Sequence, residues 1–158
     1  MVRKLLRNGF VSFASVLMFL PAAAAAAPTA AGTFEVDAPQ VTGAEQRGRT
    51  CFVDLTATFM FEGTLEGDAP ISFRIVQAGP CGETGVSQAF TAVGAFTGSV
   101  AAVPGGFSFR FQGHITDDGQ ARGQLVILDG TGGLTGLRGH LTLTGQAGVS
   151  GTYVGTVR

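Results

Sequence analysis

Hydrophobic and polar residues alternate with a period of two along most of the chain after about residue 32. The longest alternating run spans residues 51–65, and the most regular one, residues 107–112, places a phenylalanine before each of three polar residues. Such a period is typical of strands with one buried face. No long window shows the three-to-four spacing of an amphipathic helix, so the pattern predicts an all-β fold.

Turn residues divide this pattern into about eight strands. We expect them at residues 33–37, 51–65, 71–75, 90–100, 107–111, 122–128, 141–144 and 152–157, with a polar loop up to residue 49, a loop at 78–85 and turns at 66–68, 103–106 and 117–119. The strand at 122–128 contains the sequence Leu-Val-Ile-Leu and is expected to be buried on both faces. Most connections have hairpin length, which predicts an up-and-down β-barrel or, as the alternative, a β-sandwich.

The first 27 residues depart from this pattern. Arg3, Lys4 and Arg7 precede an apolar run at residues 10–20, and alanines suited to cleavage follow. This is the arrangement of a signal peptide, so we expect a cleaved signal over residues 1–27 and one domain over residues 28–158, secreted or periplasmic. A membrane anchor would need roughly 20 strongly apolar residues, and the apolar run at residues 10–20 is shorter than that. We therefore expect no stable membrane insertion after cleavage.

The net charge of the part that follows the signal bears on whether the protein binds nucleic acid. Removing the signal leaves 10 − 3 = 7 arginines and no lysine against 11 acidic residues, a net charge of −4. Proteins that hold a phosphate backbone present a basic surface. We expect no nucleic-acid partner.

The only two cysteines, Cys51 and Cys81, lie in the exported part. An even number of cysteines in an oxidising compartment favours a disulfide. A hairpin turn near Gly67 would place position 83 opposite Cys51, which brings Cys81 within reach. We expect a Cys51–Cys81 bridge that closes a loop of about 30 residues and stabilises the fold by roughly 3–4 kcal/mol.

The sequence gives little support for a metal site, a catalytic site or a phosphate-binding loop. His114 and His140 could join the cysteines in a zinc site, but no pair has the close spacing of zinc ligands. Neither histidine accompanies a recognisable nucleophile, so both are expected at strand ends on the surface, and we expect no metal, no cofactor and no catalytic residue. The glycine-rich segment 130–139 lacks the helix and lysine of a phosphate-binding loop. It is expected to be a crossing loop whose Leu134 and Leu137 point inward.

A barrel of eight strands is either filled by side chains or holds one small ligand. The phenylalanine-rich faces are expected to form the core, and the polar faces would line a pocket if they pointed into the barrel. The candidate ligand-pocket residues are Phe73, Phe109, Arg74, Arg110, Glu62 and Tyr153. We expect a non-enzymatic protein that binds a small hydrophobic ligand, or a partner through its loops. The alternative is a cyclase or isomerase acting on a hydrophobic substrate inside the barrel.

Several segments resemble a known family. They are FEGTLEG at residues 61–67, the stretch at residues 95–115, GTGGLTGLRGHLTL at residues 130–143 and the closing YVGTV. Together they resemble a bacterial family of uncharacterised small proteins grouped with allene oxide cyclase-like β-barrels, over about residues 32–158. The resemblance implies an eight-stranded antiparallel β-barrel. It implies no activity, because that family has none assigned.

Overall fold

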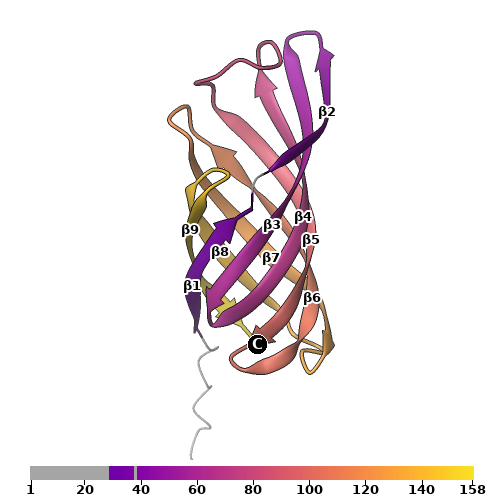
Figure 1. The fold of residues 1–158 in the computed structure, drawn as a ribbon, viewed down its shortest axis with the longest axis vertical. Coiled ribbons are helices and arrows are strands. Elements are labelled where there is room, and N and C mark those ends of the chain that lie inside the picture. Colours follow the sequence, from indigo (N-terminus) through magenta and orange to yellow (C-terminus); the bar gives the residue numbers. More distant parts are fainter. Residues whose placement is uncertain (1–28, 38) are drawn as a thin grey trace, which may run out of the picture.

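The computed structural model describes residues 29–37 and 39–158, and within them the chain forms antiparallel strands and turns (Figure 1). The strands are β1 (Thr29–Val36), β2 (Gln40–Arg47), β3 (Thr50–Gly63), β4 (Leu65–Ala78), β5 (Gln88–Val100), β6 (Val103–Ile115), β7 (Gln120–Gly132), β8 (Gly139–Gln146) and β9 (Ser150–Val157). The described residues include no helix that is long and apolar enough to cross a membrane. The predicted signal peptide lies outside the described residues.

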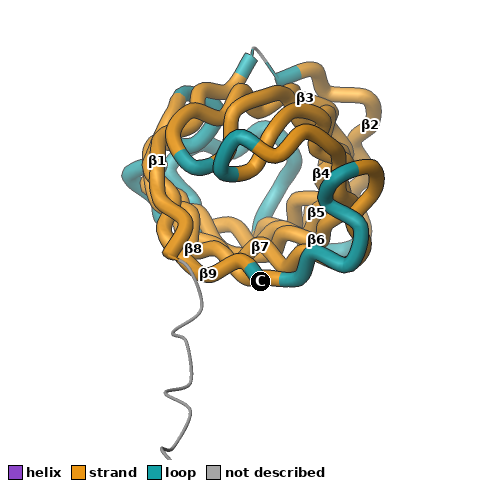
Figure 2. Tube along the Cα trace, turned by 90° about the horizontal axis from the view of Figure 1, so that it is seen from below, coloured by secondary structure: helices purple, strands orange, loops and turns teal. Residues whose placement is uncertain are grey.

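The strands close into a ring. Each strand from β2 to β8 pairs with the next one along the chain, and β1 pairs with both β9 and β3. Strands β1 and β2 share one edge of β3, since β1 pairs with residues 59–63 and β2 with residues 50–56. The nine strands therefore occupy eight positions around a barrel, seen end-on in Figure 2. The predicted eight-stranded antiparallel β-barrel is confirmed, and the sandwich alternative is wrong.

The apolar face of each strand points into the barrel. The buried core includes phenylalanines 34, 59, 61, 90, 96, 107, 109 and 111 together with Leu65, Leu125, Leu141, Leu143 and Tyr153. The expectation that residues 122–128 are buried on both faces is wrong, because Val126 is 44% and Leu128 41% exposed. One face of every strand in a single-layer barrel meets solvent, and these two side chains lie on it.

Two hairpin turns lie closer to the N-terminus than the sequence predicts. The β3–β4 turn centres on Thr64 rather than on residues 66–68, which belong to β4. The β5–β6 turn consists of Ala101 and Ala102, and residues 103–106 belong to β6. Glycines inside strands caused both errors, because they resemble turn residues in the sequence.

Strand β2 was predicted to be part of a loop. Its side chains are almost all exposed, and Gly43 lies beside a register shift in its pairing with β3. The strand is held by backbone hydrogen bonds to β3 and contributes no apolar face to the core. A strand of this kind lacks the alternation by which the other strands are recognised.

The Cys51–Cys81 disulfide is present, with the two Cα atoms 5.1 Å apart. Cys51 is buried on β3, whereas Cys81 lies in the loop that follows β4. The register used to predict the bridge is wrong, because Cys51 pairs with Gln77 and not with position 83. The loop that follows β4 turns back toward β3 and so brings Cys81 to Cys51. The bridge is consistent with an oxidising extracellular or periplasmic location.

Glycines make room for aromatic rings on neighbouring strands. A Cβ atom built on Gly94 would lie 2.5 Å from Cζ of Phe109, the residue paired with it across β5 and β6. The same relation joins three further cross-strand pairs, which are Gly113 with Phe90, Gly151 with Phe34 and Gly32 with Tyr153. Each ring occupies the space that a side chain at the glycine would need, so the glycine-rich strands and the phenylalanine-rich core form one packing arrangement.

Candidate functional site

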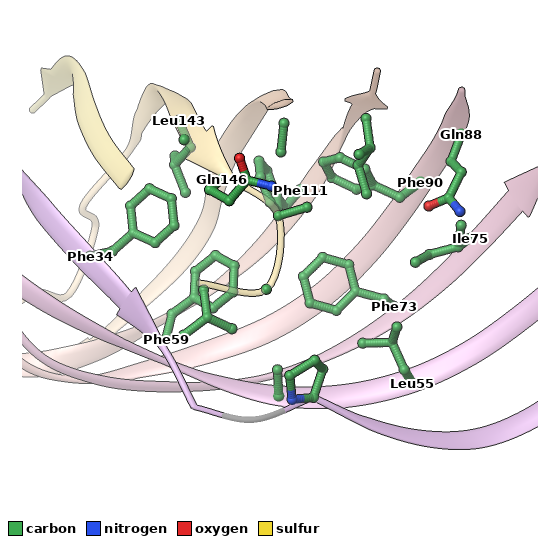
Figure 3. Close-up of a pocket in the computed structure, with 18 of the residues that line it drawn as sticks. Phe34, Leu55, Phe59, Phe73, Ile75, Gln88, Phe90, Phe111, Leu143 and Gln146 are labelled. Atoms are coloured by element: carbon green, nitrogen blue, oxygen red, sulfur yellow. The ribbon is translucent and has the colours of Figure 1, made fainter. Parts of the chain in front are cut away.

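One end of the barrel interior is not filled. A cavity of about 250 Å³ opens there, beside the β8–β9 turn and the ends of β4, β5 and β6 (Figure 3). Its lining comprises Phe34, Val36, Pro39, Leu55, Ala57, Phe59, Phe73, Ile75, Gln88, Phe90, Phe111, Ile115, Ala121, Leu143, Thr144, Gly145, Gln146, Ala147 and Gly148. The lining draws on seven of the strands, so the site is a property of the whole barrel end rather than of one loop.

The walls of the cavity are apolar. Phenyl rings surround it, and several contact one another, as in the stacked pair Phe34 and Phe59 with ring centroids 5.1 Å apart. The only polar side chains among the lining residues are those of Gln88, Thr144 and Gln146. None of the lining residues carries a charge. This combination of many apolar groups and a few neutral polar ones is that of a small-molecule binding site.

The opposite end of the barrel is closed. Leu134 is only 5% exposed and Leu137 packs against the core, so the glycine-rich segment carries two inward-pointing leucines as predicted. Between this end and the cavity, the rings of Phe96 and Phe107 stack with centroids 4.7 Å apart. The cavity is therefore a cup with one mouth and not a channel through the barrel.

Tyr153 lies in the closed half. Its hydroxyl accepts a hydrogen bond from the Leu65 amide at 2.8 Å and donates one to the Glu62 carbonyl oxygen at 3.1 Å. Burial raises the pKa of the Tyr153 hydroxyl above its usual value, because the phenolate would lose its hydration. Tyr153 is thus a neutral structural group that does not line the cavity.

The two aromatic residues predicted to line a pocket lie in different parts of the barrel interior. Phe73 lines the cavity and contacts both Phe90 and Phe111, with ring centroids 5.8 and 6.3 Å away. Phe109 is buried in the filled part of the core, over Gly94, and is absent from the lining. The alternation in the sequence is the same for both residues. Their position along the barrel axis decides which one reaches the open end.

The structure places the three charged candidates outside the cavity. Arg74, Arg110 and Glu62 are exposed on the outer face of the barrel and do not line the cavity. Arg74 lies 3.9 Å from a carboxylate oxygen of Asp54 and stacks over the ring of Phe52 on that outer face. The reason is the direction of alternation, because the apolar residues of each strand occupy the lumen and the polar ones face solvent.

Two glutamines near the mouth were not predicted. Apart from the hydroxyl of Tyr153, Gln77 has the one buried polar side chain among the described residues, with 5% exposure, and it contacts Gln88 at the rim. Gln77 continues the inward series of Ile71, Phe73 and Ile75 along β4. A polar residue in phase with an apolar series was the signal in the sequence that could have identified it.

The histidines lie apart from the cavity. His114 and His140 are exposed, as expected from the sequence. Residues 29–37 and 39–158 contain no group of three or more histidine, cysteine or carboxylate side chains placed to hold a metal ion. Both cysteines are committed to the disulfide.

Comparisons with other proteins agree with this fold. A crystal structure of a DUF3224-family protein of unknown function from Shewanella oneidensis MR-1 superposes with a TM-score of 0.67 at 22% sequence identity, covering 84% of this chain and 98% of that one. No curated protein matches the chain. A family model described as "Protein of unknown function (DUF3224)" matches residues 30–154. Because that match covers most of the sequence, the chain belongs to the DUF3224 family.

Proposed function

We propose that this protein is an exported barrel that binds a small, apolar molecule in the cavity at its open end. The observation that carries the proposal is the cavity itself, which is about 250 Å³ in volume, is walled by phenyl rings and has no charged lining residue. A ligand that enters it removes apolar surface from water, and this is the main driving force for such binding.

The volume sets the size of the ligand. An apolar cavity of roughly 150 Å³ is enough to hold benzene. The cavity described above is larger, and it is open to solvent on one side. It suits a compact molecule of about one or two rings, or a short branched chain, whose polar end remains at the mouth.

The alternative is a cyclase or isomerase of the allene oxide cyclase-like type. Catalysis by orientation alone needs only a shaped cavity, but proton transfer needs an ionisable group in contact with the substrate. Of the ionisable candidates, Arg74, Arg110 and Glu62 lie outside the barrel, and the Tyr153 hydroxyl is engaged by the backbone at the closed end. This distribution supports binding over catalysis.

Export forms part of the proposal. The signal-like pattern of residues 1–27 and the disulfide point to the same oxidising compartment. N-terminal sequencing of the protein secreted by its natural host would test this. A start close to residue 28 supports export, and an intact Met1 contradicts it.

Ligand binding can be tested by filling the cavity. Ala57 lines it, so Ala57→Leu places a larger side chain in the ligand volume, whereas Ala95→Leu makes the same change on the exposed outer face of β5. We expect naphthalene to raise the melting temperature of the unchanged protein and of Ala95→Leu, but not of Ala57→Leu. Equal naphthalene binding by all three proteins would overturn the proposal.

A further inference from the structure

A pair of glutamines connects the mouth of the cavity to the disulfide-bonded loop. Gln77 Nε2 donates hydrogen bonds to the carbonyl oxygens of Pro80 at 3.1 Å and Glu83 at 3.5 Å. Gln88 Nε2 in turn donates to Gln77 Oε1 at 2.9 Å. Gln88 lines the cavity, so the chain of contacts leads from the loop to the ligand space.

The loop fixes which way both amides point. The carbonyl oxygens of Pro80 and Glu83 can only accept, so the amino group of Gln77 must face them. Its oxygen is then left to face Gln88. Gln88 must use its own amino group for this contact, which leaves its Oε1 available on the side of the cavity.

Figure 3 shows the Gln88 oxygen on the side nearer Phe73 and Phe90, with its nitrogen on the side nearer Ile75. Within the described residues no donor is bonded to this oxygen. A ligand in the cavity therefore meets apolar rings along most of its surface and, at Gln88, a hydrogen-bond acceptor whose direction is fixed by Gln77.

We propose that the cavity selects neutral, apolar molecules that carry a hydroxyl or N–H group, and that Gln88 Oε1 accepts the hydrogen bond from this group. The inference rests on the proposed function and adds the class of ligand. A carboxylate is disfavoured because the lining offers no cationic partner to offset its loss of hydration, and the Gln88 oxygen would repel it. A plain hydrocarbon binds, but it leaves the Gln88 oxygen without a donor.

The disulfide supports this selectivity from a distance. Cys81 lies between the two residues whose carbonyls orient Gln77, and the bridge ties it to β3. The Cys81 amide also donates to Gln46 Oε1 at 2.8 Å, and Gln46 Nε2 donates to the Gly79 carbonyl at 3.2 Å. The loop that sets the amide direction is thus held covalently and by hydrogen bonds on both sides of Cys81. Gln77 and the loop are positioning elements, and Gln88 is the contact.

The test compares 1-naphthol with 1-methoxynaphthalene, which has a similar shape but no donor, by titration calorimetry. For the unchanged protein we expect 1-naphthol to bind roughly 3- to 10-fold more tightly, the usual strength of one neutral hydrogen bond. Gln88→Leu removes the acceptor and should reduce this ratio to about one. Gln112→Leu makes the same change at an exposed outward position on β6 and should leave the ratio unchanged.

Gln77→Leu tests the orientation. It leaves Gln88 free to rotate, so most of the preference for 1-naphthol should disappear while the affinity for 1-methoxynaphthalene stays close to its original value. An unchanged preference in Gln88→Leu would overturn the assignment of the acceptor, even if both compounds bind. Failure of both compounds to bind any of the proteins would overturn the proposed function as well.

Discussion

The hydroxyl oxygen of Tyr153 on β9 lies 2.8 Å from the amide nitrogen of Leu65 at the start of β4, 88 residues away in the chain. The same hydroxyl donates to the carbonyl oxygen of Glu62 on β3. One side chain therefore satisfies backbone groups on both sides of the β3–β4 turn. Tyr153 is the only tyrosine in the chain, so its contribution can be measured without interference from another phenol.

Tyr153→Phe should destabilise the barrel by about 1–3 kcal/mol, because the buried Leu65 amide loses its partner while the packing of the ring is kept. Urea unfolding followed by circular dichroism measures this. Thr152→Val removes a hydroxyl from the exposed side of the same strand and serves as the control. Equal stabilities for the two variants would contradict the structural role of the Tyr153 hydroxyl.

The same residue predicts a loss of stability in alkali. Burial raises the pKa of Tyr153 in the folded protein above the ordinary value of about 10 that holds in the unfolded chain. The stabilisation is complete below about pH 10 and falls as the pH rises through the folded pKa, because the unfolded state releases its proton first. The free energy of unfolding should therefore fall more steeply above about pH 10 in the unchanged protein than in Tyr153→Phe. Parallel curves would show that Tyr153 titrates normally.

Gly94→Ala should be costly even though the backbone at Gly94 suits alanine. The new methyl group would lie 2.5 Å from Phe109 Cζ and 2.9 Å from the carbonyl oxygen of Pro70. We expect a loss of roughly 1–3 kcal/mol from overpacking. Gly43→Ala is the matched control, since its methyl group would have no neighbour closer than 3.8 Å. A neutral Gly94→Ala would show that the ring can move aside without loss.

The β5–β6 turn can be improved. Ala101 and Ala102 have φ angles of 48° and 66°, a conformation that costs an alanine roughly 1–2 kcal/mol. Two-residue hairpin turns of this shape favour Asn-Gly. Ala101→Asn combined with Ala102→Gly should therefore raise the unfolding free energy by roughly 1–2 kcal/mol. Ala89→Gly, in the exposed part of β5, should instead lower it. A destabilised double variant would refute this account of the turn.

Removal of the disulfide by Cys51→Ala and Cys81→Ala should lower the free energy of unfolding by roughly 3–4 kcal/mol, because the unfolded chain regains the freedom of a loop of 30 residues. Guanidinium unfolding of the oxidised protein and of the double variant provides the comparison. Mass spectrometry of the non-reduced protein gives an independent check, and two free thiols there would contradict the bridge.

The sequence predicted the strands with a clear apolar face, because burial on one side imposes a period of two. The phenylalanines at positions 107, 109 and 111 all point inward as this period requires. Strand β2 escaped prediction because an edge segment held by backbone hydrogen bonds needs no apolar face. The β3–β4 turn was misplaced because Gly67 has the composition of a turn, although it lies within β4 and approaches the backbone of Thr97 on β5.

The site was harder to predict than the fold. Period-two alternation assigns a residue to the inside or the outside of a barrel, but not to a level along its axis. Phe73 and Phe109 have the same pattern, and one lines the cavity while the other lies in the filled core. Arg74, Arg110 and Glu62 do not reach the cavity, because the polar faces of their strands point to solvent. Gln88 was missed because its role depends on Gln77 and on a loop whose path the sequence does not reveal.

The cross-strand pairs of glycine and aromatic residue have a consequence for how this barrel can change during evolution. Gly94 and Phe109 share a single volume, so a methyl group gained by one must be matched by atoms lost from the other. The substitutions that a family of such barrels can accept should therefore come in coupled pairs. A change at the glycine position should leave stability unaltered only when the aromatic position has changed as well. Such coupling also allows an interior to be redesigned one pair at a time, enlarging or shrinking the cup without disturbing the hydrogen-bonded wall around it.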